Sequence, residues 1–281
     1  MIGVTDRALR AVWARPTGRA GLVLLAALAL AALVGPALLP DPAAQGDLLT
    51  EALLPPGGAH PFGTDQLSRD VLARTASGLR LSLTLGLLAA VLAVGVGTAV
   101  GLVAGAWGGA VDAVLMRLVD ALLAIPRLFL LLLALAVWDP IPMPALVLLL
   151  GVTGWYGTSR LVRGEAARLR EEEFVAAARA LGAGRGRIAG RHLLPNVAGP
   201  VLVAATLGVG DVMLLEAGLS FLGLGVRPPT PSLGGMIQDA RTVFATAPWT
   251  SIFPGLAIVL AVLAVNLVGD ALRDVLDPRS P

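Results

Sequence analysis

The chain has 281 residues, of which 56 % are apolar and 14 % are charged, and its formal net charge is +2. Soluble domains contain about 25 % charged residues, so a water-covered surface is excluded, and the long, non-alternating apolar runs predict an all-α, polytopic membrane protein rather than a β-barrel. The small net charge gives no support for nucleic-acid binding, and the absence of Cys and Lys excludes disulfides, thiol or Schiff-base chemistry and a G-x-x-x-x-G-K-[ST] phosphate loop.

Six stretches satisfy the requirement of about 20 mostly apolar residues for a membrane-spanning helix. They lie at about 21–39, 81–107, 115–137, 143–162, 197–220 and 252–272. Four Arg precede the first stretch, which leaves a signal peptide as an alternative, but its apolar run is longer than the usual 7–15 residues. The sequence therefore predicts an N-terminal segment, 1–20, followed by one transmembrane domain, 21–281.

Arginine placement predicts the orientation, because cytoplasmic loops hold an excess of basic residues. The N-terminal segment has four Arg and one acid, and the loop at 163–195 is the most basic part of the chain. Six spans place both termini and this loop on one side, so we expect the N- and C-termini and residues 163–195 in the cytoplasm. The loops at 40–79, 138–142 and 222–250 are then outside.

Several residues within the spans invite a functional interpretation. Gly97, Gly101 and Gly105 share one helix face, which favours close packing within the chain or against a partner subunit. Arg117 and Asp120 have the spacing of an ion pair on one helix. Ionisable residues in lipid are functional candidates, and Asp211 and Glu216 are the deeper ones, so we expect them to line an aqueous pathway. His60 and His192 lack metal-ligand spacing, so no metal site is predicted.

The most unusual stretch is EEEFVAAARALGAGRGRIAGRHLLPN, residues 171–196. Acids in a first helical turn are favourable, and Phe174, Ala177, Ala178 and Leu181 form one apolar face. Gly182 ends the predicted helix, and Pro195 suits the first turn of the fifth span. The helix either rests on the inner leaflet with its Arg on anionic lipid or docks into a groove on a cytoplasmic partner.

This stretch resembles the coupling loop of bacterial ABC-importer permeases, the motif E-A-A-x3-G-x9-I-x-L-P. The chain reads Ala176-Ala177-Ala178, Gly182 and His192-Leu193-Leu194-Pro195. Ala176 replaces the motif's Glu and His192 its Ile, and both departures resemble the dipeptide, oligopeptide and nickel branch. HPFGTDQLSRDVLAR at 60–74, with Ser68 where Gly is usual, LLEAGLSFLGLGVRPPTPSLGGMI at 214–237 and NLVGDALRDVLDPR at 266–279 are similar to the C-type subunit of that branch. The resemblance covers about residues 15–281.

The resemblance implies a bacterial inner-membrane subunit that forms half of a heterodimeric pore with a second permease subunit. Two cytoplasmic ATPases, which would hold ATP and Mg, and an external solute-binding protein are the other implied partners; no cofactor is expected in this chain. The resemblance implies a mechanical coupling role for Ala177, Ala178, Gly182 and Pro195. The full set of residues expected to contact an ATPase is Glu173, Phe174, Ala177, Ala178, Arg179, Leu181, Gly182, Arg185, Leu194 and Pro195.

The expected function is ATP-driven import of di- or oligopeptides, with no catalytic residue in the chain. Nickel or another small solute is the alternative substrate. A self-sufficient secondary transporter would show inverted repeats or paired broken helices, which the sequence does not clearly contain. An intramembrane serine hydrolase would need Ser220 and His192 to meet, yet the predicted topology places them on opposite sides of the membrane.

Overall fold

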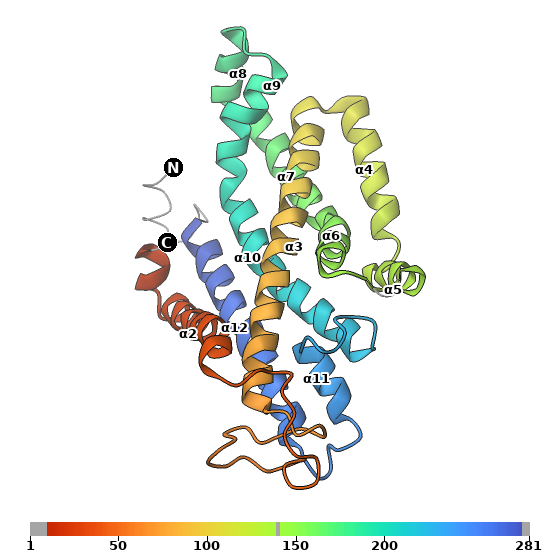
Figure 1. Ribbon diagram of the computed structural model, residues 1–281. Coiled ribbons are helices and arrows are strands. Elements are labelled where there is room, and N and C mark those ends of the chain that lie inside the picture. The colour runs from red at the N-terminus through yellow and green to blue at the C-terminus, as the bar shows by residue number, and fades with distance from the viewer. Residues whose placement is uncertain (1–9, 139–140, 277–281) are drawn as a thin grey trace. The chain divides into compact units, whose positions relative to one another are not determined.

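The computed structural model describes residues 10–138 and 141–276, and these residues contain helices and no strand (Figure 1). The all-α prediction is confirmed. The predicted N-terminal segment at 1–20, the 138–142 loop and the 266–279 stretch fall partly outside the described residues. The helices are α2 (Pro16–Leu38), α3 (Val71–Trp107), α4 (Gly109–Leu123), α5 (Arg127–Val137), α6 (Met143–Val152), α7 (Trp155–Arg170), α8 (Glu173–Ala180), α9 (Arg185–Ile188), the π-helix η1 (Ala189–Leu193), α10 (Leu194–Phe221), α11 (Leu233–Ala240) and α12 (Trp249–Leu276).

Five helical stretches in the described residues are long and apolar enough to cross a membrane, or six if a bent pair counts as one span. They are Pro16–Leu38, Val71–Trp107, Met143–Arg170, Arg185–Phe221 and Trp249–Leu276, with Gly109–Leu123 and Arg127–Val137 as the bent pair. Helix α3 begins ten residues before the predicted span. The carboxylate of Asp70 accepts a hydrogen bond from the backbone N–H of Ala73 at 2.8 Å and so caps the helix start.

The predicted third span, 115–137, is wrong as a single straight helix. The chain breaks between α4 and α5, and the two helices meet at 74°. Pro126 explains the break, because it has no N–H to donate and disfavours helical backbone at the residue before it. Arg127 follows the break and donates from Nε to Thr153 Oγ1 at 3.2 Å and from Nη2 to the carbonyl of Leu150 at 2.5 Å, so its charge is held at the end of α6.

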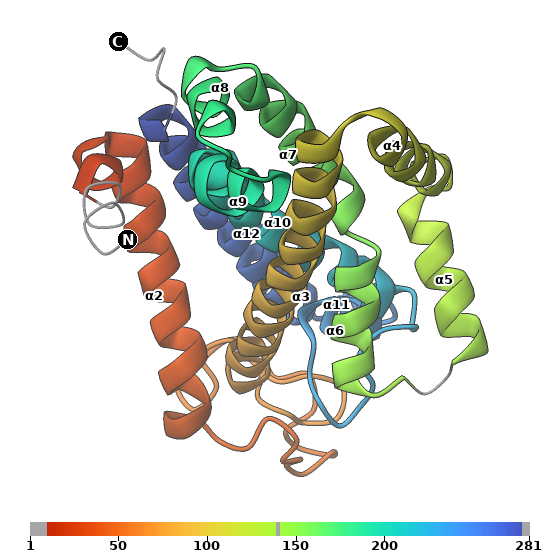
Figure 2. The same cartoon turned by 90° about the horizontal axis from the view of Figure 1, so that it is seen from above.

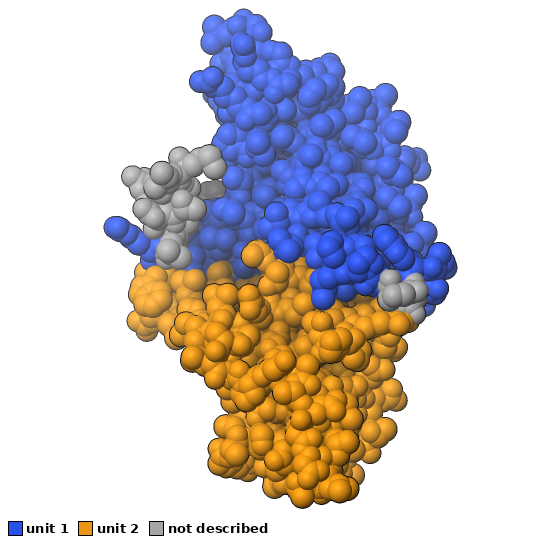
Figure 3. Space-filling model, in the orientation of Figure 1, with its two compact units in different colours: residues 1–12, 88–208, 269–281 blue, residues 13–87, 209–268 orange. Residues whose placement is uncertain are grey.

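The chain forms two compact units, each made of separate stretches of sequence (Figure 3). Unit 1 contains residues 1–12, 88–208 and 269–281, and unit 2 contains residues 13–87 and 209–268. The buried core of unit 1 includes Ala106, Val162, Ala166, Leu169, Val175, Ile188, Ala189, Leu193 and Val197. A core cluster of unit 2 includes Ala32, Leu79, Met213, Leu233, Ala257, Ile258 and Ala261.

In unit 1, the three glycines on α3 pack against α7. A Cβ placed on Gly97 would lie 2.7 Å from Thr158 Cβ, and one on Gly105 would lie 2.6 Å from Ala166 Cβ. A Cβ on Gly101 would lie 2.9 Å from Val162 Cβ. Packing within the chain is therefore confirmed for this face, since no side chain fits between the two helices.

The predicted pairing of Arg117 with Asp120 is wrong. Asp120 instead pairs with Arg160, and the neighbouring Asp112 pairs with Arg163, whose Nε donates to Asp112 Oδ1 at 2.8 Å. Both ion pairs join α4 to α7. Pairs between helices replace the pair within α4 because the planar guanidinium of each α7 Arg reaches across to a carboxylate on the neighbouring helix.

Candidate functional site

The segment between α7 and α10 lies entirely in unit 1. The chain leaves α7 at Arg170, forms α8 and α9 as a short helical hairpin, and enters α10 through η1. Figures 1 and 2 show this hairpin at the end of the unit where α7 stops. The predicted short helix with acids in its first turn is confirmed as α8, Glu173–Ala180, which begins at the last Glu of the triplet.

Ion pairs tie the acidic triplet to the end of α7. Arg168 donates from Nη1 to Glu172 at 2.7 Å, and Arg170 donates from Nε to Glu171 at 3.1 Å. Glu172 is the N-cap residue of α8, and Glu173 lies in its first turn, where a carboxylate interacts favourably with the helix dipole. The triplet thus fixes the direction in which α8 leaves α7.

Helix α8 has one face packed inward and another that is exposed. Val175 belongs to the buried core of unit 1, and Ala178 is buried as well. Phe174 is 42 % exposed and Leu181 89 % exposed, and Ala177 between them is also exposed. The predicted apolar face therefore needs a correction: Ala178 turns inward with Val175, because these two residues are three apart and share one side of α8, a helix that contacts α7 and α9.

Gly182 ends α8 as predicted, by a specific backbone arrangement. Its φ is +83°, in the left-handed region that favours glycine. The N–H of Ala183 donates to the carbonyl of Ala178 at 3.0 Å, and the N–H of Gly182 donates to the carbonyl of Arg179 at 2.9 Å. These are the two bonds of a Schellman motif. No atom lies within 4 Å of a Cβ built at Gly182, so the constraint comes from its backbone and not from crowding.

Pro195 is the second residue of α10, so its predicted place in the first turn of the fifth span is confirmed, but the chain before it is already helical through α9 and η1. A proline there cannot donate to the carbonyl of Arg191 and crowds it. The π-turn of η1 immediately before Pro195 widens the helix and accommodates this defect. The side chain of Asn196 donates to the carbonyl of His192 at 2.6 Å, which satisfies a group near the disrupted turn.

The remaining predicted contact residues surround this hairpin. Arg179 donates from Nη2 to the carbonyl of Arg170 at 3.3 Å, and Arg185 and Leu194 are exposed. The rings of Phe174 and His192 lie 6.5 Å apart, so the two ends of the motif meet in space. Contact of any of these residues with an ATPase stays a prediction.

The two predicted pathway residues lie in different surroundings on α10. Asp211 is exposed, whereas Glu216 is fully buried. Glu216 accepts hydrogen bonds from Ser82 Oγ on α3 at 3.0 Å and from Ser220 Oγ at 2.7 Å, and Ser232 also bonds to it. The structure does not bring Asp211 and Glu216 together, and their role in a pathway stays a prediction. No pattern in the sequence linked these serines to Glu216, because only their three-dimensional meeting at one carboxylate marks them.

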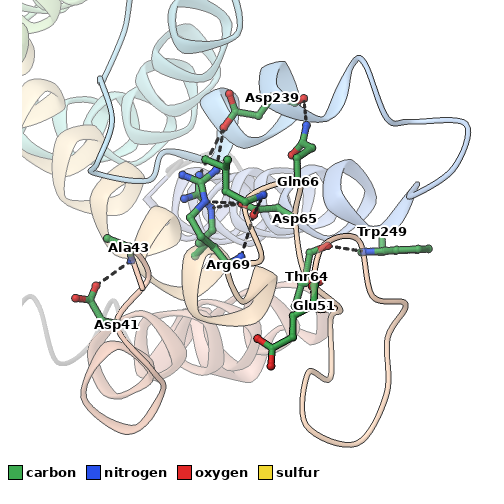
Figure 4. A network of polar contacts seen from close by, with 11 residues as sticks. Asp41, Ala43, Glu51, Thr64, Asp65, Gln66, Arg69, Asp239 and Trp249 are labelled. Atoms are coloured by element: carbon green, nitrogen blue, oxygen red, sulfur yellow. Dashed lines mark hydrogen bonds and ion pairs between the residues drawn. The ribbon is translucent and has the colours of Figure 1, made fainter. Parts of the chain in front are cut away.

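A second buried charged group in unit 2, which was not predicted from the sequence, lies in the loop before α3 and in the first turn of α3 (Figure 4). Asp65 accepts from Arg69 Nε at 2.7 Å and lies 3.4 Å from Arg74 Nε. Asp239 on α11 lies 3.6 Å from Arg69 and 3.7 Å from Arg74. Asp65, Arg69 and Arg74 are each buried, whereas Asp239 is 43 % exposed. The repeated Asp and Arg of the 60–74 stretch were the only signal in the sequence.

Two further contacts hold the same loop. Trp249 Nε1 donates to the carbonyl of Thr64 at 3.1 Å, and Gln66 donates to the carbonyl of Asp239 at 2.5 Å (Figure 4). Ser68 has a φ of +56°, a backbone conformation in which glycine is the least strained residue. The turn forms despite this, and Ser68 Oγ donates to the carbonyl of Asp47 at 3.1 Å. The loop is thus a defined part of unit 2.

Within the described residues, no group of three or more His, Cys, Asp or Glu side chains is placed to hold a metal ion. His60 instead bonds through Nδ1 to Asp70 at 2.8 Å. His192 lies in unit 1 and Ser220 in unit 2. The arrangement in the described residues therefore offers packed helices, buried ion pairs and one exposed helical hairpin.

Comparison with known proteins matches residues 97–280 to the family described as binding-protein-dependent transport system inner membrane component. The dipeptide transport system permease protein DppC of Alkalihalophilus pseudofirmus is 40 % identical over 92 % of this chain and 84 % of that protein. DppC of Bacillus subtilis is 38 % identical over 99 % of this chain and 87 % of that protein. The oligopeptide transport system permease protein OppC of Mycobacterium tuberculosis is 42 % identical over 93 % of this chain and 91 % of that protein.

Proposed function

The chain belongs to the family of binding-protein-dependent transport system inner membrane components, and we propose that it is the C-type permease subunit of an ATP-driven importer of di- or oligopeptides. The apolar helices and the family description agree on a multi-pass protein of the bacterial inner membrane. The peptide substrate is supported by the printed names of relatives that match nearly the whole chain. Nickel or another small solute is the alternative.

One observation supports the coupling role most directly: α8 has one face packed against its own chain and an opposite face that is apolar and exposed. Val175, in the core of unit 1, and Ala178 are buried on the first face, while Phe174, Ala177 and Leu181 are exposed on the other. Exposed aromatic and Leu side chains on a short helix are typical of docking into a groove on another protein. A helix anchored on its own core transmits a push from that groove as a rigid body.

The proposed assembly supplies what this chain does not contain. ATP and Mg belong to two ATPase subunits that receive α8, and a second permease subunit completes the pore. An external solute-binding protein delivers the substrate. Asp211 is the better candidate for the pathway, because an exposed carboxylate within a span avoids hydrocarbon and favours water or another subunit. Glu216 is bonded to the chain's own serines, which favours a structural role.

The orientation has a direct test, because the chain has no Cys. Leu181→Cys and Leu49→Cys are a matched pair, because the two residues are 89 % and 94 % exposed. Leu181 lies in the loop predicted to be cytoplasmic, 163–195, and Leu49 in a loop predicted to be outside, 40–79. We expect a membrane-impermeant maleimide to label Leu49→Cys in intact spheroplasts and Leu181→Cys only after permeabilisation. Labelling of Leu181→Cys from outside would overturn the proposed orientation.

The function is tested in proteoliposomes that contain this chain with its co-expressed permease and ATPase partners. We expect uptake of a labelled dipeptide that requires ATP inside and the binding protein outside. In the same membranes, Leu181→Cys should cross-link to the ATPase and Leu49→Cys should not. Uptake driven by an ion gradient without ATP would exclude the proposal, and uptake of nickel but not peptide would select the alternative substrate.

A further inference from the structure

A cavity of about 410 Å³ lies beside the α8–α9 hairpin, within unit 1. The end of α3, the end of α7, helix α8 and the start of α9 all contribute to its walls. The lining residues are Ala106, Trp107, Arg170, Glu171, Arg179, Ala183, Arg185 and Ile188. This volume lies within the range of about 300–1,000 Å³ that is typical of small-molecule sites.

The cavity wall is strongly basic. Three guanidinium groups, from Arg170, Arg179 and Arg185, face one carboxylate, that of Glu171. Arg170 is held in place, since it donates from Nη1 to the carbonyl of Gly105 at 3.2 Å and from Nε to Glu171 at 3.1 Å. Arg179 uses Nη2 on the carbonyl of Arg170, which leaves its other nitrogens available.

Arg185 differs from these two residues. Among the described residues its guanidinium forms no hydrogen bond or ion pair, and the residue is exposed at the start of α9. The wall therefore contains more guanidinium donors than its own carboxylate and carbonyls satisfy. Uncompensated positive charge that converges from three separate helical segments favours an anionic occupant.

We propose that this cavity binds a phosphate-bearing anion, held by Arg170, Arg179 and Arg185. Guanidinium groups match phosphate oxygens with two parallel hydrogen bonds, which distinguishes a phosphate from a neutral solute. The phosphate comes either from the headgroup of an anionic lipid or from a free phosphate compound. The partly buried indole of Trp107 forms an apolar wall beside the charged one.

Arg179 and Arg185 were among the residues expected to contact an ATPase, but the cavity that they line and the exposed apolar face of α8 lie on different sides of that helix, so we assign these two residues to the anion. Ala177 is on the exposed apolar face, and Arg179 is two residues later, which is about 200° around a helix with 3.6 residues per turn. An anion in the cavity and a protein on the apolar face can therefore be present together. An anion bridging the three Arg would link α8 to the ends of α3 and α7, and so restrict the movement of the coupling helix.

The test uses the assembled transporter in nanodiscs and reads Trp107 emission as the difference between the complex and its Trp107→Phe variant. One probe is phosphatidylglycerol mixed into phosphatidylcholine nanodiscs, and the other is inorganic phosphate added to nanodiscs of phosphatidylcholine alone. The test variant is R179Q/R185Q. The matched control is R187Q/R191Q, which removes the same charge from exposed Arg of the same segment that do not line the cavity.

We expect at least one probe to change Trp107 emission in the unaltered complex and in R187Q/R191Q. R179Q/R185Q should bind that probe roughly tenfold or more weakly for each lost guanidinium. A response to phosphatidylglycerol alone identifies a lipid headgroup, and a response to inorganic phosphate identifies a free anion. R179K/R185K, which keeps the charge and loses the planar fork, should be intermediate and should fold normally.

The proposal is wrong if neither probe changes Trp107 emission in the unaltered complex. It is also wrong if R179Q/R185Q and R187Q/R191Q respond equally. Binding is measured without transport, so either result leaves the proposed importer function unaffected.

Discussion

Segments 41–74 and 171–195 are both charged stretches in an apolar chain, yet their charges have different surroundings. In the first, Asp65, Arg69 and Arg74 are buried and pair with one another and with Asp239. In the second, Arg179 and Arg185 are exposed, and so are the apolar side chains of Phe174 and Leu181. A buried charge must be paired within its own chain, so the first segment is built for stability and the second leaves its side chains available for other molecules.

The first prediction concerns the buried ion pairs that Asp65 forms with Arg69 and Arg74. Asp65→Ala removes the carboxylate that lies between Arg69 and Arg74. Breaking a buried ion pair in this way costs about 3–5 kcal/mol, because it leaves uncompensated buried charge. We expect a large fall in the thermal transition of the detergent-purified chain and in its amount in the membrane.

Asp239→Ala is the matched control, because Asp239 is 43 % exposed and lies 3.6–3.7 Å from the same Arg residues. Asp239→Ala should lower the thermal transition clearly less than Asp65→Ala does, since water can replace an exposed partner. Equal and small effects of the two substitutions would show that the network does not stabilise the loop, and the contrast between the segments would fail.

The second prediction concerns Glu216. Glu216→Leu keeps the side chain's bulk and deprives Ser82 and Ser220 of their acceptor. Each buried donor without a partner costs about 1–3 kcal/mol, but the substitution also removes a carboxylate that is costly to bury, so the thermal transition should fall by less than in Asp65→Ala. Adding Ser82→Ala should recover part of the loss, because it removes one of the orphaned hydroxyls. No recovery in this double variant would mean that Glu216 acts by another route.

The third prediction concerns the end of α8. Gly182→Val places a β-branched residue at a φ of +83°, which costs about 1–2 kcal/mol, and we expect it to unwind the last turn of α8 and lower peptide uptake strongly. Gly182→Asn, which tolerates this backbone conformation, should retain most of the uptake. Since a Cβ at this position meets no atom within 4 Å, equal loss in both variants would indicate crowding by a partner instead.

Local rules predicted the parts of the chain that depend on local sequence. The apolar runs gave the positions of most spans, and Gly182 gave the end of α8, because helix termination needs only the residue at the left-handed position. The break before Arg127 was missed because the apolar run continues through Pro126, and hydropathy does not register a lost N–H. Pro195 was placed correctly in the first turn of α10, but the helical chain before it was missed because a π-turn has no clear signature in sequence.

Contacts between residues far apart in the sequence were the main feature that could not be predicted. Asp65 and Asp239 meet the same two Arg residues although 174 positions separate them, and Glu216 meets Ser82 across 134 positions. Such pairs depend on which helices pack together, and spacing along the chain does not encode that. The same limit applies to α8, where Ala178 rather than Ala177 is the inward residue because of how α8 packs against its neighbours α7 and α9.

The smallest expected effect on stability is at Phe174, and it tests the contrast most sharply. Phe174 is 42 % exposed and its neighbour Val175 is fully buried in the core of unit 1. Phe174→Ala should change the thermal transition by no more than an exposed substitution does, about 0.5 kcal/mol, yet reduce ATP-driven peptide uptake severely because the docking face loses its aromatic anchor. Val175→Ala should do the reverse, lowering stability by about 1–3 kcal/mol through lost apolar burial and lowering uptake only in proportion to the protein lost. If Phe174→Ala instead destabilises the chain and spares uptake per folded molecule, the exposed face of α8 serves the fold, and the division of the two segments into a structural and a partner-binding one is wrong.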